Sequence, residues 1–168
     1  SYFKENTRDG QTQFHGQLAA KTLSVVEHIM KVRDTLDCWF NADMVPLEFR
    51  KGTHEGSYNS VAHYAYTPYL HNKEAGSKIS NIDSTKVLVN RWIKKGKDPS
   101  QSESHVFSNK GVAYDMLSVF YSIRRLDFGK MKKGKTLRYV CYDGVKSQII
   151  KVEFQGEEEC ELRSDKKY

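Results

Sequence analysis

The sequence lacks the motifs that would assign it at once to a membrane, metal-binding or disulfide-linked class. No apolar run approaches the ~18 residues that a membrane-spanning helix needs. The three cysteines, Cys38, Cys141 and Cys160, lie far apart without C-x-x-C spacing, which excludes a disulfide framework and a zinc ribbon. The pairing of Cys141 with Cys160 stays open, because both fall in segments that we interpret as neighbouring strands. The six histidines form no H-x-x-x-H or H-E-x-x-H pair, so we assign no metal ligand and no cofactor.

Proline is also scarce, at three residues, and no internal repeat or low-complexity segment occurs. Long disordered stretches are therefore not expected. A chain of 168 residues can bury a real core without covalent cross-links. We expect a single β-rich domain over residues 1–168. The chain starts at Ser1 without a signal peptide, so we expect a trimmed N-terminal part, either because such a peptide was removed or because the sequence begins inside the gene.

Positive charge is in excess, with 27 basic against 21 acidic residues and a net charge of +6. The basic residues are scattered, which favours a solvated surface over a nucleic-acid interface. Their densest cluster contains four lysines: Lys130, Lys132, Lys133 and Lys135. A polyanion-binding module that uses these lysines is an alternative function.

Alternating apolar and polar residues are the main structural signal, and tyrosine supplies 10 of the aromatic residues. The predicted strands cover residues 11–21, 32–40, 47–51, 58–67, 85–94, 136–143 and 145–155. Two short amphipathic helices are predicted at 25–32 and 115–126, the second with Asp115 as its N-cap. Residues 68–82 resemble a turn, and 96–104 look like a mobile linker. The fold class is mainly β with two short helices, an antiparallel meander forming a curved sheet or half-open, lipocalin-like barrel.

Residues 129–136 match the nucleotide-binding pattern G-x-x-x-x-G-K-[ST] at every position. That pattern binds phosphates only when a strand leads into the loop and a helix follows it. Here the predicted helix comes first and a strand follows, so we interpret the segment as a basic exposed turn.

One charged residue conflicts with the apolar face of the second helix. Arg124 projects into the arc formed by six residues, Met116, Leu117, Val119, Phe120, Tyr121 and Ile123, while Ser118, Ser122 and Arg125 face away. Asp34 is a similar anomaly, because it shares one face of the strand at 32–40 with the apolar residues Val32, Leu36, Cys38 and Phe40. We predict that Asp34 and Arg124 form a buried ion pair between helix and sheet, with a ligand-binding role as the alternative.

The stretch Tyr-Asp-x-x-Ser-x-x-Tyr-x-x-Arg resembles the bacterial domain of unknown function family 3108, at Tyr114, Asp115, Ser118, Tyr121 and Arg124. The resemblance extends over residues 11–160. Members typically enter the export pathway, and many in Bacteroides-like bacteria look periplasmic or lipid-anchored. The resemblance implies a periplasmic or cell-envelope location, a lipid anchor in the precursor and a lipocalin-like or half-open barrel. It implies no reaction, and the family's leading strands look short or missing.

Together these features favour a non-enzymatic cell-envelope protein whose curved sheet binds an apolar or amphipathic ligand, such as a lipid, or a partner protein. This hypothesis predicts a concave apolar face with Arg124 near its rim or floor. Asp115 and Tyr121, from the same stretch, join Asp34 and Arg124 as candidate site residues. The alternative is an enzyme acting on envelope polymers, for which only Asp34, Asp115 and Arg124 qualify as converging charged groups; we assign no catalytic residue.

Overall fold

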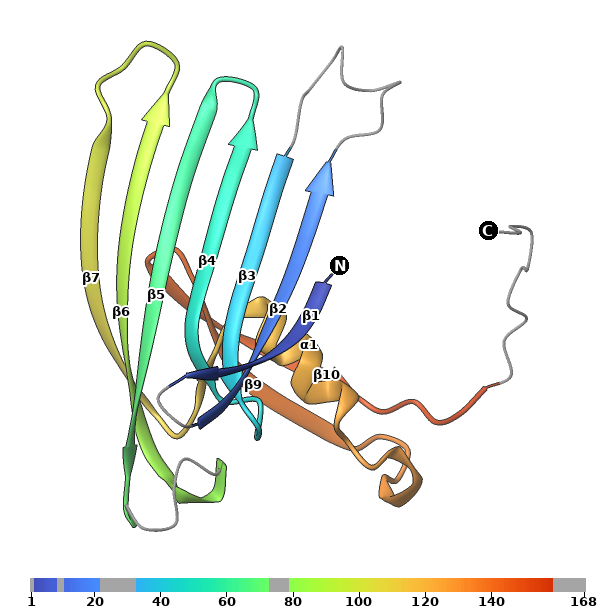
Figure 1. The fold of residues 1–168 in the computed structure, drawn as a ribbon. Helices are drawn as coiled ribbons and strands as arrows, with labels where there is room; N and C mark the ends of the chain where they lie inside the picture. The colour runs from blue at the N-terminus through green and yellow to red at the C-terminus, as the bar shows by residue number, and fades with distance from the viewer. Residues whose placement is uncertain (1, 9–10, 22–32, 73–78, 159–168) are drawn as a thin grey trace.

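The computed structural model describes residues 2–8, 11–21, 33–72 and 79–158. Its main feature is a seven-stranded antiparallel sheet in which each strand pairs with its neighbour in the chain (Figure 1). The strands are β1 (Tyr2–Arg8), β2 (Gln11–Lys21), β3 (Arg33–Asn41), β4 (Pro46–Glu55), β5 (Tyr58–Leu70), β6 (Ile82–Lys95) and β7 (Gln101–Lys110). The sheet is strongly curved and is not closed into a barrel. The predicted mainly β fold with a curved antiparallel sheet is therefore confirmed.

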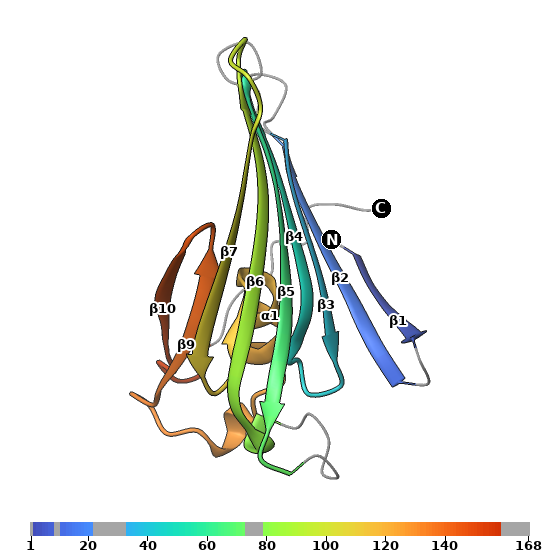
Figure 2. The ribbon, with the colours of Figure 1, turned by 90° about the vertical axis from the view of Figure 1, so that its left-hand side faces the viewer.

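The C-terminal third of the chain forms a second layer. It contains β8 (Ala113–Tyr114), α1 (Met116–Arg124), β9 (Thr136–Asp143) and β10 (Lys146–Glu153), with short 3-10 helices η1 (Ile79–Asn81) and η2 (Phe128–Lys130) in the connections. β9 pairs with β10 in antiparallel and with β8 in parallel orientation. Figures 1 and 2 show α1 and this small sheet against the concave face of the large sheet, whose strand ends extend past them.

The core lies where the second layer covers the concave face. Alternate residues of the large sheet point into it, and Leu117 of α1 and Tyr142 of β9 close it from the other side. The buried sheet residues are Cys38, Phe40, Phe49, Ala62, Tyr64, Tyr66, Val87 and Val89. Burial of Cys38 and Phe40 confirms the period of two that the sequence showed along β3.

Three parts of the sequence-based prediction differ from the structure or fall outside it. The predicted linker at 96–104 overlaps β7, which begins at Gln101 and forms one edge of the sheet. Backbone pairing with β6 holds this strand, so it needs few apolar side chains. β1 was not predicted, although it pairs with β2 over its whole length. The predicted helix at 25–32 lies outside the described residues.

Candidate functional site

The start of α1 is fixed by Asp115, which is fully buried. Its Oδ1 accepts hydrogen bonds from the amides of Leu117 and Ser118, both at 2.9 Å, and Ser118 Oγ accepts from the Asp115 amide at 3.0 Å. The thiol of Cys38 on β3 donates to Asp115 Oδ2 at 3.1 Å. The predicted N-cap is confirmed as part of a capping box. Burial raises the pKa of the Asp115 carboxyl, an effect that the hydrogen bonds from Ser118, Cys38 and Leu117 oppose.

The orientation of α1 differs from the one that the sequence predicted. Ser118 and Ser122 are buried, although a helical wheel placed them on the outer face. Met116 and Phe120, predicted to be inside, are 45% and 53% exposed. The physical reason is tertiary contact, because the hydrogen bond from Cys38 holds Asp115 in the core and Gly16 lets Tyr121 approach β2, which together place Ser118 inside and leave the side of Met116 open. The helix therefore exposes part of its apolar surface.

A close approach between α1 and β2 keeps the helix in this position. A Cβ atom at Gly16 would lie 2.5 Å from Cε2 of Tyr121, so only glycine leaves room for the ring. The same ring packs against Phe40 of β3 at a centroid distance of 5.3 Å. Tyr121, a candidate from the sequence, thus anchors the helix over β2 and β3.

An apolar groove runs between α1 and strands β2 and β3, with a volume of about 460 Å³. We call it the α1 groove; its lining residues are Gln17, Leu18, Leu36, Met116, Leu117, Phe120, Tyr121 and Arg124. Met116, Phe120 and Arg124 are four residues apart, so they form one row along the helix. The guanidinium carbon of Arg124 lies 5.7 Å from the centroid of the Phe120 ring. The row therefore passes from apolar to cationic at the C-terminal end of α1.

The predicted buried pair of Asp34 and Arg124 is wrong. Arg124 is exposed and lines the α1 groove, whereas Asp34 is half-buried, lines a different pocket and accepts from the His54 amide at 3.3 Å. No ion pair joins the two side chains in the part of the chain that the structure describes. The exposed guanidinium keeps its hydration, which avoids the cost of burying a charge.

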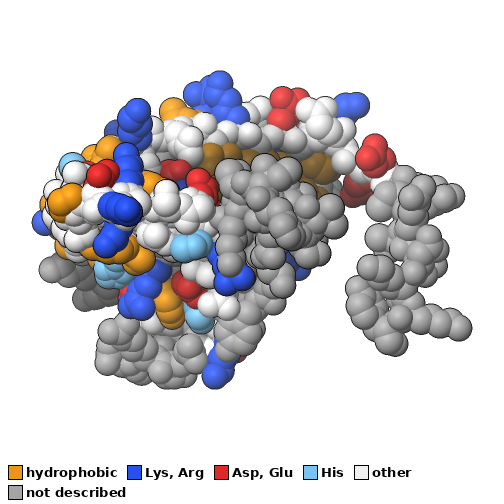
Figure 3. Space-filling view, turned by 90° about the horizontal axis from the view of Figure 1, so that it is seen from above, with side chains coloured by type: hydrophobic (Ala, Val, Ile, Leu, Met, Phe, Trp, Pro, Cys, Tyr) orange, Lys and Arg blue, Asp and Glu red, His pale blue; other side chains and the backbone are white. Residues whose placement is uncertain are grey.

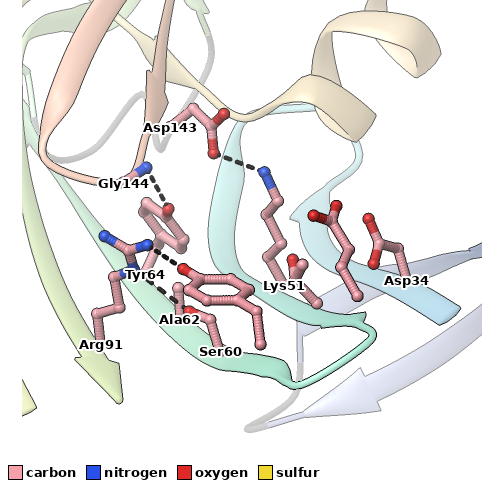
Figure 4. Close-up of a pocket in the computed structure, with 11 residues that line it drawn as sticks. Asp34, Lys51, Ser60, Ala62, Tyr64, Arg91, Asp143 and Gly144 are labelled. Carbon is pink, nitrogen blue, oxygen red and sulfur yellow. Dashed lines mark hydrogen bonds and ion pairs between the residues drawn. The ribbon is translucent and has the colours of Figure 1, made fainter. Parts of the chain in front are cut away.

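A second, polar pocket of about 210 Å³ lies beyond the covered part of the concave face (Figure 4). We call it the polar pocket; its lining residues are Asp34, Lys51, Thr53, Glu55, Tyr58, Ser60, Ala62, Tyr64, Arg91, Asp143 and Gly144. Lys51 Nζ lies 2.9 Å from Asp143 Oδ1 of the β9–β10 hairpin. The Gly144 amide of that hairpin donates to the Tyr64 hydroxyl at 2.7 Å. The pocket is thus closed on one side by the second layer.

Arg91 is held in the polar pocket by three oxygen acceptors. It donates to the Tyr58 hydroxyl at 2.7 Å, to Glu103 Oε1 at 3.2 Å and to Ser60 Oγ at 3.3 Å. Partial burial of Tyr64 raises the pKa of its phenol to about 12, so it stays protonated at neutral pH. Of the candidate site residues named from the sequence, Asp34 is the one that lines this pocket. One signal in the sequence could have indicated the pocket. Along one face of a strand the residues change from apolar to polar, as from Val89 to Arg91 on β6.

The basic turn contributes to neither site. It follows α1 and precedes β9, the reverse of a phosphate-binding loop, which confirms the interpretation from the sequence. Lys130 pairs with Asp127 at 2.7 Å, and Lys132, Lys133 and Lys135 are exposed. On the face shown in Figure 3, basic side chains are dispersed among acidic and neutral ones. Among the described residues, no group of three or more His, Cys, Asp or Glu is placed to hold a metal ion.

Residues 2–167 match the family described as protein of unknown function (DUF3108), so the chain belongs to this family, as the resemblance of its sequence indicated. No curated protein and no solved structure matches the chain. Within the described residues, none of the helices has the length and apolar character needed to cross a membrane.

Proposed function

We propose that this member of the DUF3108 family is a non-enzymatic protein of the cell envelope that binds an amphipathic molecule in the α1 groove. The apolar chain of the ligand lies along Met116 and Phe120, and its anionic group lies at Arg124. One observation carries the proposal, namely an apolar groove that ends at a cation. A helix that packs only for stability buries its apolar stripe, whereas α1 leaves part of that stripe open to solvent.

The size and lining of the α1 groove suit an alkyl chain. Its volume of about 460 Å³ falls within the ~300–1,000 Å³ of typical small-molecule sites. Leu18, on the opposite wall, is 41% exposed, so both walls offer apolar surface to a ligand. Each methylene that leaves water contributes about 0.8 kcal/mol, which makes several buried methylenes sufficient for measurable affinity.

The charge of the α1 groove favours an anion. Arg124 is the one cation among the described residues that line it, and that lining contains no carboxylate. A guanidinium matches carboxylate and phosphate oxygens in bidentate geometry. The remaining polar groups are the amide of Gln17 and the phenol of Tyr121, and neither is a general base near pH 7. This lining supports binding in preference to catalysis.

Calorimetry with three twelve-carbon probes below their micellar concentrations tests the proposal. Dodecanoate should bind more tightly than dodecanol, and dodecanol more tightly than dodecyltrimethylammonium. Phe120→Ser should weaken binding of all three, while Phe128→Ser, which replaces a 38% exposed ring outside the groove, should not. Arg124→Gln should reduce dodecanoate affinity about tenfold, to the level of dodecanol, through loss of one charge-assisted contact.

Equal affinities of Phe120→Ser and the parent protein for dodecanoate would exclude the α1 groove as the site. Preference for the cationic probe would exclude the role of Arg124. The location is a separate part of the proposal and follows from what the family resemblance implies. Fractionation of native cells should recover the protein with the periplasm or envelope, and recovery with the cytosol would contradict it.

A further inference from the structure

The polar pocket shares no lining residue with the α1 groove, and its charges do not cancel. Its lining contains three carboxylates, Asp34, Glu55 and Asp143, and two cations, Lys51 and Arg91. Lys51 is neutralised by Asp143 inside the pocket. Arg91 is neutralised by Glu103, which stands outside the lining. The charges of Asp34 and Glu55 therefore remain uncompensated.

Asp34 and Glu55 also keep unused acceptor capacity. A carboxylate can accept about four hydrogen bonds. Asp34 accepts one hydrogen bond, from the His54 amide. Among the residues that the structure describes, no hydrogen bond is donated to the side chain of Glu55. No ion pair reaches either carboxylate in that part of the chain. The pocket thus presents negative charge and acceptors on this wall.

The cations of the polar pocket do not offer an alternative site for an anion. Arg91 donates three of its five N–H groups to oxygens, and one of these acceptors is the Glu103 carboxylate, which balances its charge. Lys51 is engaged at 2.9 Å by Asp143. Because these contacts form without a ligand, an added anion would gain little and would meet two free carboxylates.

We propose that the polar pocket binds the primary ammonium group of a small organic cation. Such a group carries three N–H donors, which match the carboxylates of Asp34 and Glu55 together with the hydroxyl oxygens of the lining. A metal site is not favoured, because no group of three or more His, Cys, Asp or Glu is placed to hold an ion in the part of the chain that the structure describes. The volume of about 210 Å³ lies below the ~300 Å³ of sites for drug-sized ligands, so it suits a compact ammonium ligand.

A matched set of two-carbon probes tests the sign of charge that the polar pocket selects. Ethanolamine, ethylene glycol and glycolate have similar size and a shared hydroxyl group, but they are cationic, neutral and anionic at pH 7. Titration of ¹⁵N-labelled protein at constant ionic strength follows the amide resonance of Gly144, which lines the pocket, against that of Gly134 in the distant basic turn. Ethanolamine should shift the Gly144 resonance saturably, and the other two probes should not.

Two isosteric variants test the residues. Asp34→Asn and Glu55→Gln should each weaken ethanolamine binding about tenfold, because each replaces a charged acceptor with a neutral amide. Asp98→Asn, an exposed turn residue outside the pocket, is the matched control and should bind as the parent protein does. Unchanged affinity in both pocket variants, or an equal Gly144 shift with glycolate, would overturn the proposal.

A fourth probe, phosphoethanolamine, distinguishes two sources of the ammonium group. Tighter binding than that of ethanolamine would assign the group to a lipid-type headgroup, and weaker binding would assign it to a free amine. This proposal does not rest on the function proposed for the α1 groove. Phe120→Ser should leave the ethanolamine response intact, so failure at one site is distinguishable from failure at the other.

Discussion

Replacing Asp115 with alanine should destabilise the protein by about 2–3 kcal/mol, as the sum of a lost N-cap and one newly unsatisfied buried donor. The cap interaction with the amides of Leu117 and Ser118 contributes about 1–2 kcal/mol. The Cys38 thiol would also lose its acceptor inside the core. Each buried donor left without a partner costs about 1–3 kcal/mol, with a weak thiol donor at the lower limit.

Asp115→Asn separates the geometry of the cap from its charge. The amide oxygen can still accept from the Leu117 and Ser118 amides, so this variant should lose less stability than Asp115→Ala. Burial raises the pKa of Asp115 in the folded state above the value of 3.8 that the carboxyl has in the unfolded chain. The stabilisation that comes from this shift is therefore fully present below pH 3.8. It is lost as the pH rises through the folded-state pKa. The deficit of the Asn variant relative to the parent should therefore shrink between a pH below 3.8 and pH 7.

Urea unfolding followed by circular dichroism at both pH values measures these differences. Asp127→Ala is a suitable control, because Asp127 also precedes a short helix but its side chain makes no capping hydrogen bond and is exposed. Its effect should stay within about 0.5 kcal/mol. A cost below about 1 kcal/mol for Asp115→Ala would refute the account of the cap. A deficit of the Asn variant that grows with pH would refute the sign of the pKa shift.

Two further predictions concern the core beneath α1. Gly16→Ala should lower the free energy of unfolding by about 1–3 kcal/mol, because its Cβ would lie 2.5 Å from the Tyr121 ring. In the double variant with Tyr121→Ala, the loss measured by urea unfolding should be smaller than the sum of the two single losses. Additive costs would contradict the clash. Cys38 and Cys141 should resist iodoacetamide in the folded protein and react in urea, because burial raises the pKa of both thiols, that of Cys141 to about 12. Rapid labelling of Cys38 or Cys141 in the folded protein, located by peptide mass spectrometry, would show that the core opens.

Features set by neighbouring residues could be predicted from the sequence. Apolar and polar residues alternate over 11–21, and aromatic and β-branched residues are frequent over 136–143. The structure has strands β2 and β9 at these same bounds. Asp115 was identified as an N-cap because its side chain needs only the next three residues to satisfy the amides. The order of helix and strand around the basic turn is likewise a local property. It was enough to exclude a nucleotide site despite a complete motif match.

Features that depend on how α1 rests on the sheet could not be predicted in this way. A helical wheel gives the relative directions of Phe120 and Arg124 but not the rotation of the helix against its support. That rotation depends on the contact of Asp115 with Cys38, 77 residues away, and on the absence of a side chain at Gly16. The same limit applies to the polar pocket, whose residues converge from β3 to β6 and the β9–β10 hairpin.

The two sites adjoin on β3, which determines how their ligands should interact. Leu36 lines the α1 groove, and Asp34, two residues away on the same face of β3, lines the polar pocket. Lys51 of the polar pocket lies opposite Leu36 in the pairing of β3 with β4. If each site takes its own ligand, ethanolamine should bind equally well to protein saturated with dodecanoate. Competition between them would show that the two sites are not independent, as expected if one longer molecule places its anionic group at Arg124 and its ammonium group at Asp34. Repeating the Gly144 titration in the presence of dodecanoate decides between these arrangements.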